Sequence, residues 1–160
     1  MSPVCANGRL IQKPGKDFAR QSRGTPPEIY AVLDDEFRFT LDPCPLDATA
    51  TAGASLWGKD GLQWSWKGER VFCNPPYGAI SPWLKKAYEA IVAVYLLPVR
   101  SDLDWWHDYA MRADEARFIH RRLRFAGTSG GAPFPSVVLV FDLRRGRAGT
   151  RYTSMERPER

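Results

Sequence analysis

The four residues of this sequence best suited to chemistry are Asn74-Pro75-Pro76-Tyr77, which directly follow the apolar run 71–73. The run is typical of a buried strand, and two consecutive prolines exclude both helix and strand pairing just beyond it. An asparagine carboxamide, a rigid carbonyl and an aromatic ring would therefore lie together where a strand ends. This set suits a flat ring that carries an exocyclic amino group, such as adenine, and it predicts methylation of that amino nitrogen.

Such a nitrogen is a poor nucleophile because its lone pair is delocalised into the ring. Two acceptors that bind both N–H groups would pull the nitrogen toward a tetrahedral geometry. The side-chain oxygen of Asn74 and the carbonyl of Pro75 could supply these acceptors, and the fixed φ of proline would hold the second one in place. The reaction then needs neither a metal nor a covalent enzyme intermediate.

Two aromatic residues are candidates for contact with the base. A base in a duplex would first have to leave the stack, after which Tyr77 could stack on it for about 1–3 kcal/mol. The alternative for Tyr77 is an aromatic plug on a turn. Phe134 lies in a proline-flanked loop and either flanks the base or packs beneath that loop.

The composition fits one globular domain, since 160 residues with 44% hydrophobic content can bury a single core. No apolar run is long enough to cross a membrane, and residues 1–21 lack the apolar core of a secretion signal. Three cysteines without a Cys-x-x-Cys pair, with only two histidines, argue against a zinc site. The cysteine usage favours a reducing cytoplasm.

The chain is basic, with a net charge of +5 and a pI near 9.3. Its arginines gather late in the sequence, which suits a polyanion such as DNA or RNA. The alternative is a solvated surface followed by a disordered basic tail. The late arginines are Arg117, Arg121, Arg122, Arg124, Arg144, Arg145, Arg147 and Arg151.

Helical and strand patterns alternate along the chain. A helix is expected from Thr25, whose side chain would cap it, with two prolines in its first turn. The other expected elements are strands at 37–41, 71–73, 91–97, 116–120 and 136–142, helices at 81–90 and 104–112, a loop with one weak helix at 44–62, and a hairpin start at 122–125. This order predicts an α/β domain with a mixed sheet. Asp42, Asn74 and Pro98 each end a strand and should share one rim of it.

Further segments accompany the Asn-Pro-Pro-Tyr motif in a fixed order. They are Thr25-Pro26, Leu41–Cys44, Val71–Gly78, Trp83–Ala87, Arg124-Phe125 and Pro133–Ser136. Together they resemble the small phage DNA N6-adenine methyltransferases of the Dam type, over residues 24–142. The resemblance implies a Rossmann-like fold that uses S-adenosylmethionine as cofactor and double-stranded DNA as partner. It also implies a cytoplasmic protein of a bacterial host, with a phage or prophage origin.

The resemblance assigns cofactor-binding roles residue by residue. Thr25 and Pro26 match the segment that touches the methionine end of the cofactor. Asp42 and Pro43 match the segment after the first strand, where an acidic residue lies near the methionine amino group or the ribose. Asp60 matches the acidic residue that meets the cofactor's adenine. The implied domains are a flexible arm at 1–23, a methyltransferase domain at 24–143 and a disordered basic tail at 144–160.

One feature departs from the family pattern. The usual glycine-rich turn after the first strand is replaced by residues 42–47, Asp-Pro-Cys-Pro-Leu-Asp. Asp42 and Asn74 are also too close in sequence for two full βα units, which predicts a sheet trimmed on that side relative to the full seven-stranded form. The altered turn leaves a catalytically inert DNA-binding relic open. Methylation of RNA adenine or of a protein glutamine also stays open, because methylases of RNA and of proteins resemble this chain in the tetrapeptide. The sequence does not determine the recognised DNA site, the oligomeric state, or whether the use is restriction-modification or regulation.

Overall fold

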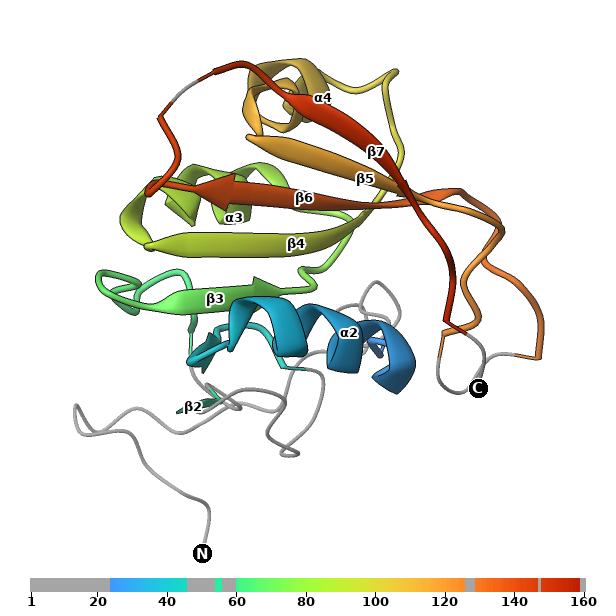
Figure 1. Ribbon diagram of the computed structural model, residues 1–160, viewed down its shortest axis with the longest axis horizontal. Helices are drawn as coiled ribbons and strands as arrows, with labels where there is room; N and C mark the ends of the chain where they lie inside the picture. Colours follow the sequence, from blue (N-terminus) through green and yellow to red (C-terminus); the bar gives the residue numbers. More distant parts are fainter. Residues whose placement is uncertain (1–23, 46–53, 56–59, 126–128, 147, 159–160) are drawn as a thin grey trace, which may run out of the picture.

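The computed structural model describes residues 24–45, 54–55, 60–125, 129–146 and 148–158, and these form a seven-stranded mixed sheet (Figure 1). The strand order is β2-β1-β3-β4-β6-β5-β7. The strands are β1 (Leu41–Asp42), β2 (Ala54–Ser55), β3 (Arg70–Cys73), β4 (Val92–Pro98), β5 (Glu115–Ile119), β6 (Ser136–Asp142) and β7 (Arg151–Met155). Strands β2, β1, β3 and β4 pair in parallel, β6 runs antiparallel to both β4 and β5, and β7 pairs in parallel with β5.

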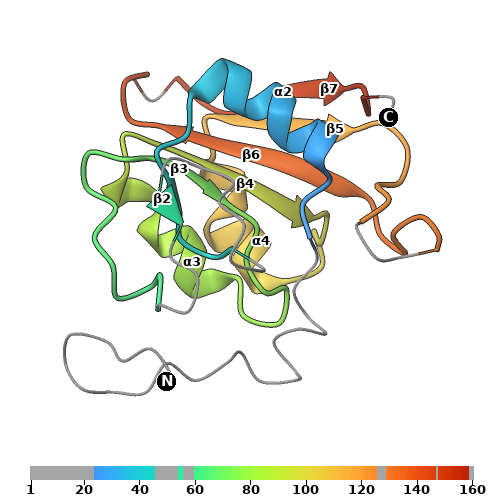
Figure 2. The same cartoon turned by 90° about the horizontal axis from the view of Figure 1, so that it is seen from below.

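Helices cover both faces of this sheet, as Figure 2 shows. Helix α2 (Pro27–Phe37) packs on one face. On the other face lie α3 (Ser81–Lys85), which runs into the 3-10 helix η1 (Lys86–Glu89), and α4 (Asp104–Asp108), which is followed by the 3-10 helix η2 (Ala110–Arg112). The chain thus has a helix–sheet–helix arrangement, and its central strands must be apolar on both sides.

Strand β4 illustrates this two-sided burial. Leu96 packs with Leu33 in the core beneath α2. The adjacent Tyr95 belongs to the opposite core, and its hydroxyl donates a 2.7 Å hydrogen bond to the carbonyl of Trp83 in α3. Successive residues alternate in this way because side chains of a strand point to opposite faces in turn. The strand predicted from the continuous apolar run 91–97 is therefore confirmed.

Most of the other expected strands are confirmed, and three expected elements are wrong. Strands at 71–73, 116–120 and 136–142 are present within a residue or two. The strand expected at 37–41 is wrong, because Phe37 ends α2 and Arg38 turns the chain with φ 53° in the left-handed region. Three buried residues at i, i+4 spacing (Ile29, Leu33 and Phe37) hold this segment as a helix. Residues 122–125 form no strand either, and the described part of 44–62 contains β2 rather than a helix.

The tail was expected to be disordered, and this is wrong for Arg151–Met155, which form β7. This strand pairs with β5 over five residues, from Glu115 opposite Arg151 to Ile119 opposite Met155. Its ladder is reinforced by an ion pair between Arg151 and Glu115 at 2.8 Å. At the opposite edge of the sheet, strands β1 and β2 are only two residues long each. With β7 included, the described sheet nevertheless has seven strands.

The expected N-terminal arm, residues 1–23, lies outside the described residues. Among the residues that are described, no helix combines the length and the apolar character needed to cross a membrane.

Candidate active site

The strand directions bring distant segments to one rim of the sheet. Strands β1, β3 and β4 are parallel, so their carboxyl ends at Asp42, Cys73 and Pro98 lie at the same rim. Strand β6 runs the opposite way and starts there, with Ser136 opposite Pro98. In Figure 1 this rim is on the right, where the start of α2 and the segment between β5 and β6 also lie. The expectation that Asp42, Asn74 and Pro98 share one rim is confirmed.

Asn74 is buried at this rim, with 7% of its surface exposed. Its Nδ2 donates a hydrogen bond of 3.1 Å to Thr25 Oγ1, which connects the end of β3 to the residues just before α2. Thr25 does not cap the helix as expected, because the N-cap position is Pro26 and no side-chain capping bond is formed. The bond to Thr25 instead fixes the carboxamide of Asn74, so that its acceptor atom Oδ1 has a defined orientation.

A cavity of about 130 Å³ lies beside the segment Asn74–Tyr77. It is lined by Tyr77, Ile80, Pro98, Arg100, Leu103, Trp105 and Phe134. The rings of Tyr77 and Phe134 are 5.6 Å apart at an interplanar angle of 77°, an edge-to-face contact. Phe134 also lies 6.1 Å from Phe125. Phe134 therefore lines the cavity and also lies near Phe125, and its contact with a base stays a prediction.

Three of the residues expected to bind the cofactor, Asp42, Pro43 and Asp60, lie at a close backbone contact. Asp42 is buried, and its Oδ1 accepts a 3.0 Å hydrogen bond from the Cys44 backbone N–H, which closes the turn after β1. A Cβ added to Gly61 would lie only 1.9 Å from the Pro43 carbonyl oxygen, so the chain at 60–61 passes directly against this turn. Asp60 is exposed beside it. Asp42, Pro43 and Asp60 are therefore neighbours.

The contribution of Gly61 was not recognised in the sequence. Its carbonyl accepts a 3.0 Å hydrogen bond from the indole Nε1 of Trp66, a fully buried side chain. Asp60 Oδ1 accepts a 3.0 Å bond from the Leu62 N–H, which tightens the turn. An isolated glycine next to the matched aspartate was the available signal, since glycine marks places where two backbones approach closely.

Two buried thiols border this turn and are unreactive. Burial raises the pKa of Cys73, and the nearby Cys44 and the negative charge of Asp42 raise it further. Burial and then Asp42 likewise raise the pKa of Cys44. Both thiols are neutral near pH 7, so neither provides a thiolate nucleophile.

The segment after β4 supplies cavity residues that sequence reasoning missed. Arg100 lines the cavity, and its guanidinium donates to both carboxylate oxygens of Asp102, at 2.9 and 2.8 Å. This hydrogen bonding lowers the pKa of Asp102 to about 2. Trp105, in α4, forms another wall. Pro98 ends a predicted strand, so the residues that follow it were expected at the same rim as Asn74. This position in the sequence was the signal that could have identified Arg100 and Trp105 as cavity residues.

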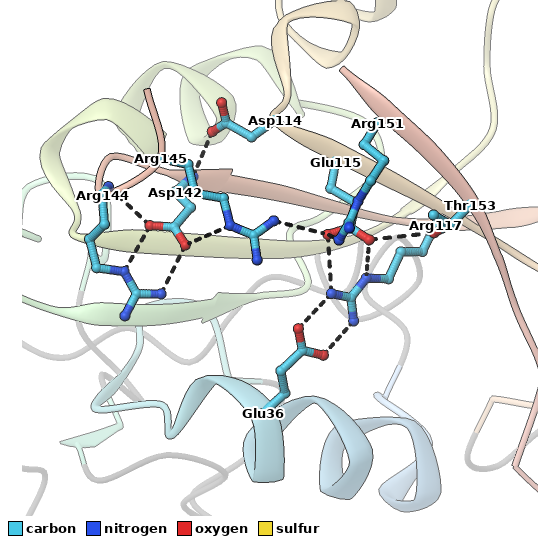
Figure 3. A network of polar contacts seen from close by, with 9 residues as sticks. All are labelled: Glu36, Asp114, Glu115, Arg117, Asp142, Arg144, Arg145, Arg151 and Thr153. Atoms are coloured by element: carbon cyan, nitrogen blue, oxygen red, sulfur yellow. Dashed lines mark hydrogen bonds and ion pairs between the residues drawn. The ribbon is translucent and has the colours of Figure 1, made fainter. Parts of the chain in front are cut away.

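Arg147 lies outside the described residues, and the other late arginines separate into two groups, of which the first is shown in Figure 3. Arg117 forms two hydrogen bonds of 2.6 Å with Glu36 of α2 and also binds Glu115 at 3.0 Å. Arg151 binds the same Glu115 at 2.8 Å. Arginines of this group are thus engaged by carboxylates of the fold.

Asp142, at the end of β6, completes the network of Figure 3. It accepts two hydrogen bonds of 2.8 Å from Arg144 and lies 3.5 Å from Arg145. Asp142 pairs with Val92 at the start of β4, so this end of the network lies at the rim opposite to the cavity. These arginines link α2, β5, β6 and β7, and the expectation that they bind a polyanion is not supported by their contacts.

Fold and site together define an α/β protein with an aromatic cavity and an Asn-Pro-Pro-Tyr segment at the carboxyl rim of its sheet. The model of the DNA N-6-adenine-methyltransferase (Dam) family matches residues 13–141, and the chain belongs to this family. The resemblance to the Dam type, drawn from the motif and its flanking segments, is thereby confirmed. No match was found to a curated protein or to a solved structure.

Proposed function

We propose that the protein is a DNA adenine-N6 methyltransferase that takes its methyl group from S-adenosylmethionine. Membership of the Dam family supports activity on DNA adenine. The observation that carries the proposal is the carboxamide of Asn74, held by Thr25 at the rim that also bears the aromatic cavity. A Rossmann-like fold is part of the proposal, since the parallel strands β1, β3 and β4 and the helices on both faces suit a ligand at this rim.

The acceptor pair of this mechanism is Asn74 Oδ1 and the carbonyl of Pro75. Together they bind the two N–H groups of the adenine amino nitrogen, which returns its lone pair for attack. Pro75 and Pro76 are both buried, so this pair acts in a site with limited access to water. Holding the reactants at contact distance contributes several kcal/mol of a maximum of roughly 7–11 kcal/mol.

The cavity receives the adenine after it has been rotated out of the duplex. Tyr77 is partly buried and offers its ring as a stacking surface, while Phe134 holds that ring edge-to-face and flanks the base. Trp105 closes the far wall. Base–aromatic stacking of about 1–3 kcal/mol offsets part of the cost of unstacking.

The residues at the turn after β1 fit the proposed cofactor. When bound, S-adenosylmethionine supplies a sulfonium methyl group. Asp42 and Asp60 are carboxylates suited to its amino and hydroxyl donors, and Gly61 allows the chain to approach Pro43 closely without a side chain between them. Thr25 and Pro26, next to Asn74, complete the set. Close backbone approach at Gly61 replaces the role of the absent glycine-rich turn.

Parallel transfer assays separate the substrates that this site could accept. Tritiated S-adenosylmethionine is offered with duplex DNA, RNA and protein, and label is expected on DNA as N6-methyladenine. Label confined to RNA or to protein glutamine would reject the proposal. Sequencing of DNA from expressing cells then reports the modified base and its sequence context. Action in the cytoplasm of a bacterial host, with a phage or prophage origin, belongs to the same proposal.

The substitution Asn74→Ala separates catalysis from binding. It removes an acceptor that acts only on the reacting amino group, so methyl transfer should fall below detection while duplex affinity changes by less than about twofold. Transfer is measured with labelled cofactor and affinity by fluorescence anisotropy. Equal losses of both would indicate a structural role. A wild-type protein that binds DNA but shows no calorimetric binding of the cofactor would instead be an inert relic.

A further inference from the structure

Three arginines of the late basic cluster are not part of the carboxylate network. Arg121, Arg122 and Arg124 follow β5 and are exposed. Within the part of the chain that the structure describes, none of the three forms an ion pair with a carboxylate. Their charges are therefore available to a partner, in contrast to the charges of Arg117 and Arg151.

The fold directs these arginines outward. Leu123 and Phe125 are each 1% exposed and anchor the segment in the core beneath α2. The carbonyl of Leu123 also accepts a 2.7 Å hydrogen bond from the Ala132 N–H. Arg122 and Arg124 alternate with the two buried residues and therefore project to the other side, as in an extended segment.

The same segment lies at the rim of the candidate site. Strands β4 and β5 are both antiparallel to β6, so β5 ends at the rim where β4 ends (Figure 1). Phe125, next to Arg124, is 6.1 Å from Phe134, which is in turn 5.6 Å from Tyr77 at the cavity. Two ring contacts thus connect the exposed arginines to the cavity wall.

Two acidic side chains near this segment have hydrogen-bond partners. Glu156 lies 3.2 Å from the ring of His120, and Asp102 is bound by Arg100. Arg157 donates a 3.0 Å hydrogen bond to the carbonyl of Arg122 and adds another guanidinium. This part of the rim therefore carries several guanidinium groups close together.

We infer that Arg121, Arg122 and Arg124 bind the phosphate backbone of duplex DNA beside the cavity. The inference rests on the proposed function and identifies the surface that holds the substrate. A target base can enter the cavity only if its strand is held next to it, and guanidinium groups suit phosphate oxygens in charge and geometry. The four arginines held by carboxylates, Arg117, Arg144, Arg145 and Arg151, take no part.

The test compares two variants that each remove two positive charges. Arg122→Ala/Arg124→Ala changes the proposed surface. Lys67→Ala/Arg112→Ala is the matched control, because both residues are exposed and precede β3 and β5, at the opposite rim. Binding of a duplex oligonucleotide is measured by fluorescence anisotropy over a range of salt concentrations. Circular dichroism and calorimetric binding of the cofactor establish that each variant is folded.

Each phosphate contact steepens the plot of log Kobs against log salt by about 0.9. The rim variant should therefore lose about 1.8 from the slope and bind more weakly at every salt concentration, while the control keeps the wild-type slope. An unchanged slope in the rim variant, an equal loss in the control, or tighter wild-type binding to duplex RNA than to DNA would overturn the inference.

The outcome for the surface is separate from the outcome for the proposed function. If the wild type binds DNA through these arginines but transfers no methyl group, the proposed methyltransferase function is rejected and the proposed DNA-binding surface stands. If the wild type methylates DNA but the rim variant keeps the wild-type salt slope, the proposed DNA-binding surface is rejected and the methyltransferase function stands.

Discussion

A hydrogen bond from Asn74 to Thr25 orients the candidate catalytic carboxamide. Because Asn74 Nδ2 donates to Thr25 Oγ1, the acceptor oxygen of the amide is fixed before any substrate arrives. Preorganised acceptors of this kind need no rearrangement during the reaction. Thr25 is therefore a positioning residue for Asn74, in addition to the cofactor contact proposed for it.

Thr25→Val should lower kcat while leaving the KM for DNA nearly unchanged. Valine keeps the branched shape but removes the acceptor, and a net hydrogen bond of about 0.5–1.5 kcal/mol corresponds to a loss of up to about tenfold. Steady-state kinetics measure both constants. Thr25→Ser retains the hydroxyl and should restore kcat. A valine variant with wild-type kcat would show that the bond does not position the amide.

At the scale of elements, the turn after β1 packs directly against the segment at 60–61. The Pro43 carbonyl and Gly61 are in direct contact, and Trp66 holds Gly61 from the other side. This contact does not involve the helix that normally follows a strand in an α/β unit. The spacing of the two carboxylates proposed for the cofactor depends on it.

Gly61→Ala should destabilise the protein by about 1–3 kcal/mol, because the added Cβ would overlap backbone atoms that can move only with the turn. Affinity for S-adenosylmethionine should fall as well. Denaturant unfolding and calorimetry are the measurements. Gly130→Ala is the control, since a Cβ there meets nothing within 4 Å. It should change stability by less than about 0.5 kcal/mol. Equal effects at the two positions would contradict this account of the turn.

At the scale of the whole molecule, Glu115 is the centre of a network that fastens the C-terminal strand. Its carboxylate is 2% exposed and contacts Arg117 and Arg151, which belong to β5 and β7. Burial alone would raise the pKa of Glu115, but hydrogen bonds from Arg117 and Arg151 outweigh it and hold this pKa below its ordinary value. Hydrogen bonds from Arg144 lower the pKa of Asp142 in the same way.

Glu115→Gln should reduce the free energy of unfolding by about 1.5–3 kcal/mol at pH 7, the range for hydrogen bonds to charged groups. A lowered folded-state pKa stabilises the fold above about pH 4.3, the unfolded glutamate value. This stabilisation disappears as the pH falls through the lower folded-state value. The variant should therefore show a flatter dependence of stability on pH below about pH 5, measured by urea unfolding.

The matched control for this substitution is Glu156→Gln. Its side chain is 82% exposed and lies 3.2 Å from the ring of His120. The change in stability should stay within about 0.5 kcal/mol. If the free energy of unfolding depends on pH in the same way for the wild type and for Glu115→Gln, the network contributes no acid-sensitive stability.

The sequence by itself determined the order of the main elements and the location of the motif. The run 91–97 could only be a strand buried on both faces, and Asn74 had to follow a strand that two prolines terminate. The shared rim of Asp42, Asn74 and Pro98 followed from the parallel arrangement that alternating helices and strands require. These features depend on local patterns of apolar residues and prolines, which are visible along the chain.

Only the tertiary structure decided which side chains meet. The bond between Asn74 and Thr25 joins residues 49 positions apart, and the pairing of Arg151 with Glu115 turns an apparently disordered tail into a strand. The same packing gives some late arginines a carboxylate partner and leaves Arg121, Arg122 and Arg124 without one among the described residues, although all of them look alike in the sequence. Such contacts depend on how distant elements pack in space, and a local pattern of residue types does not encode that packing.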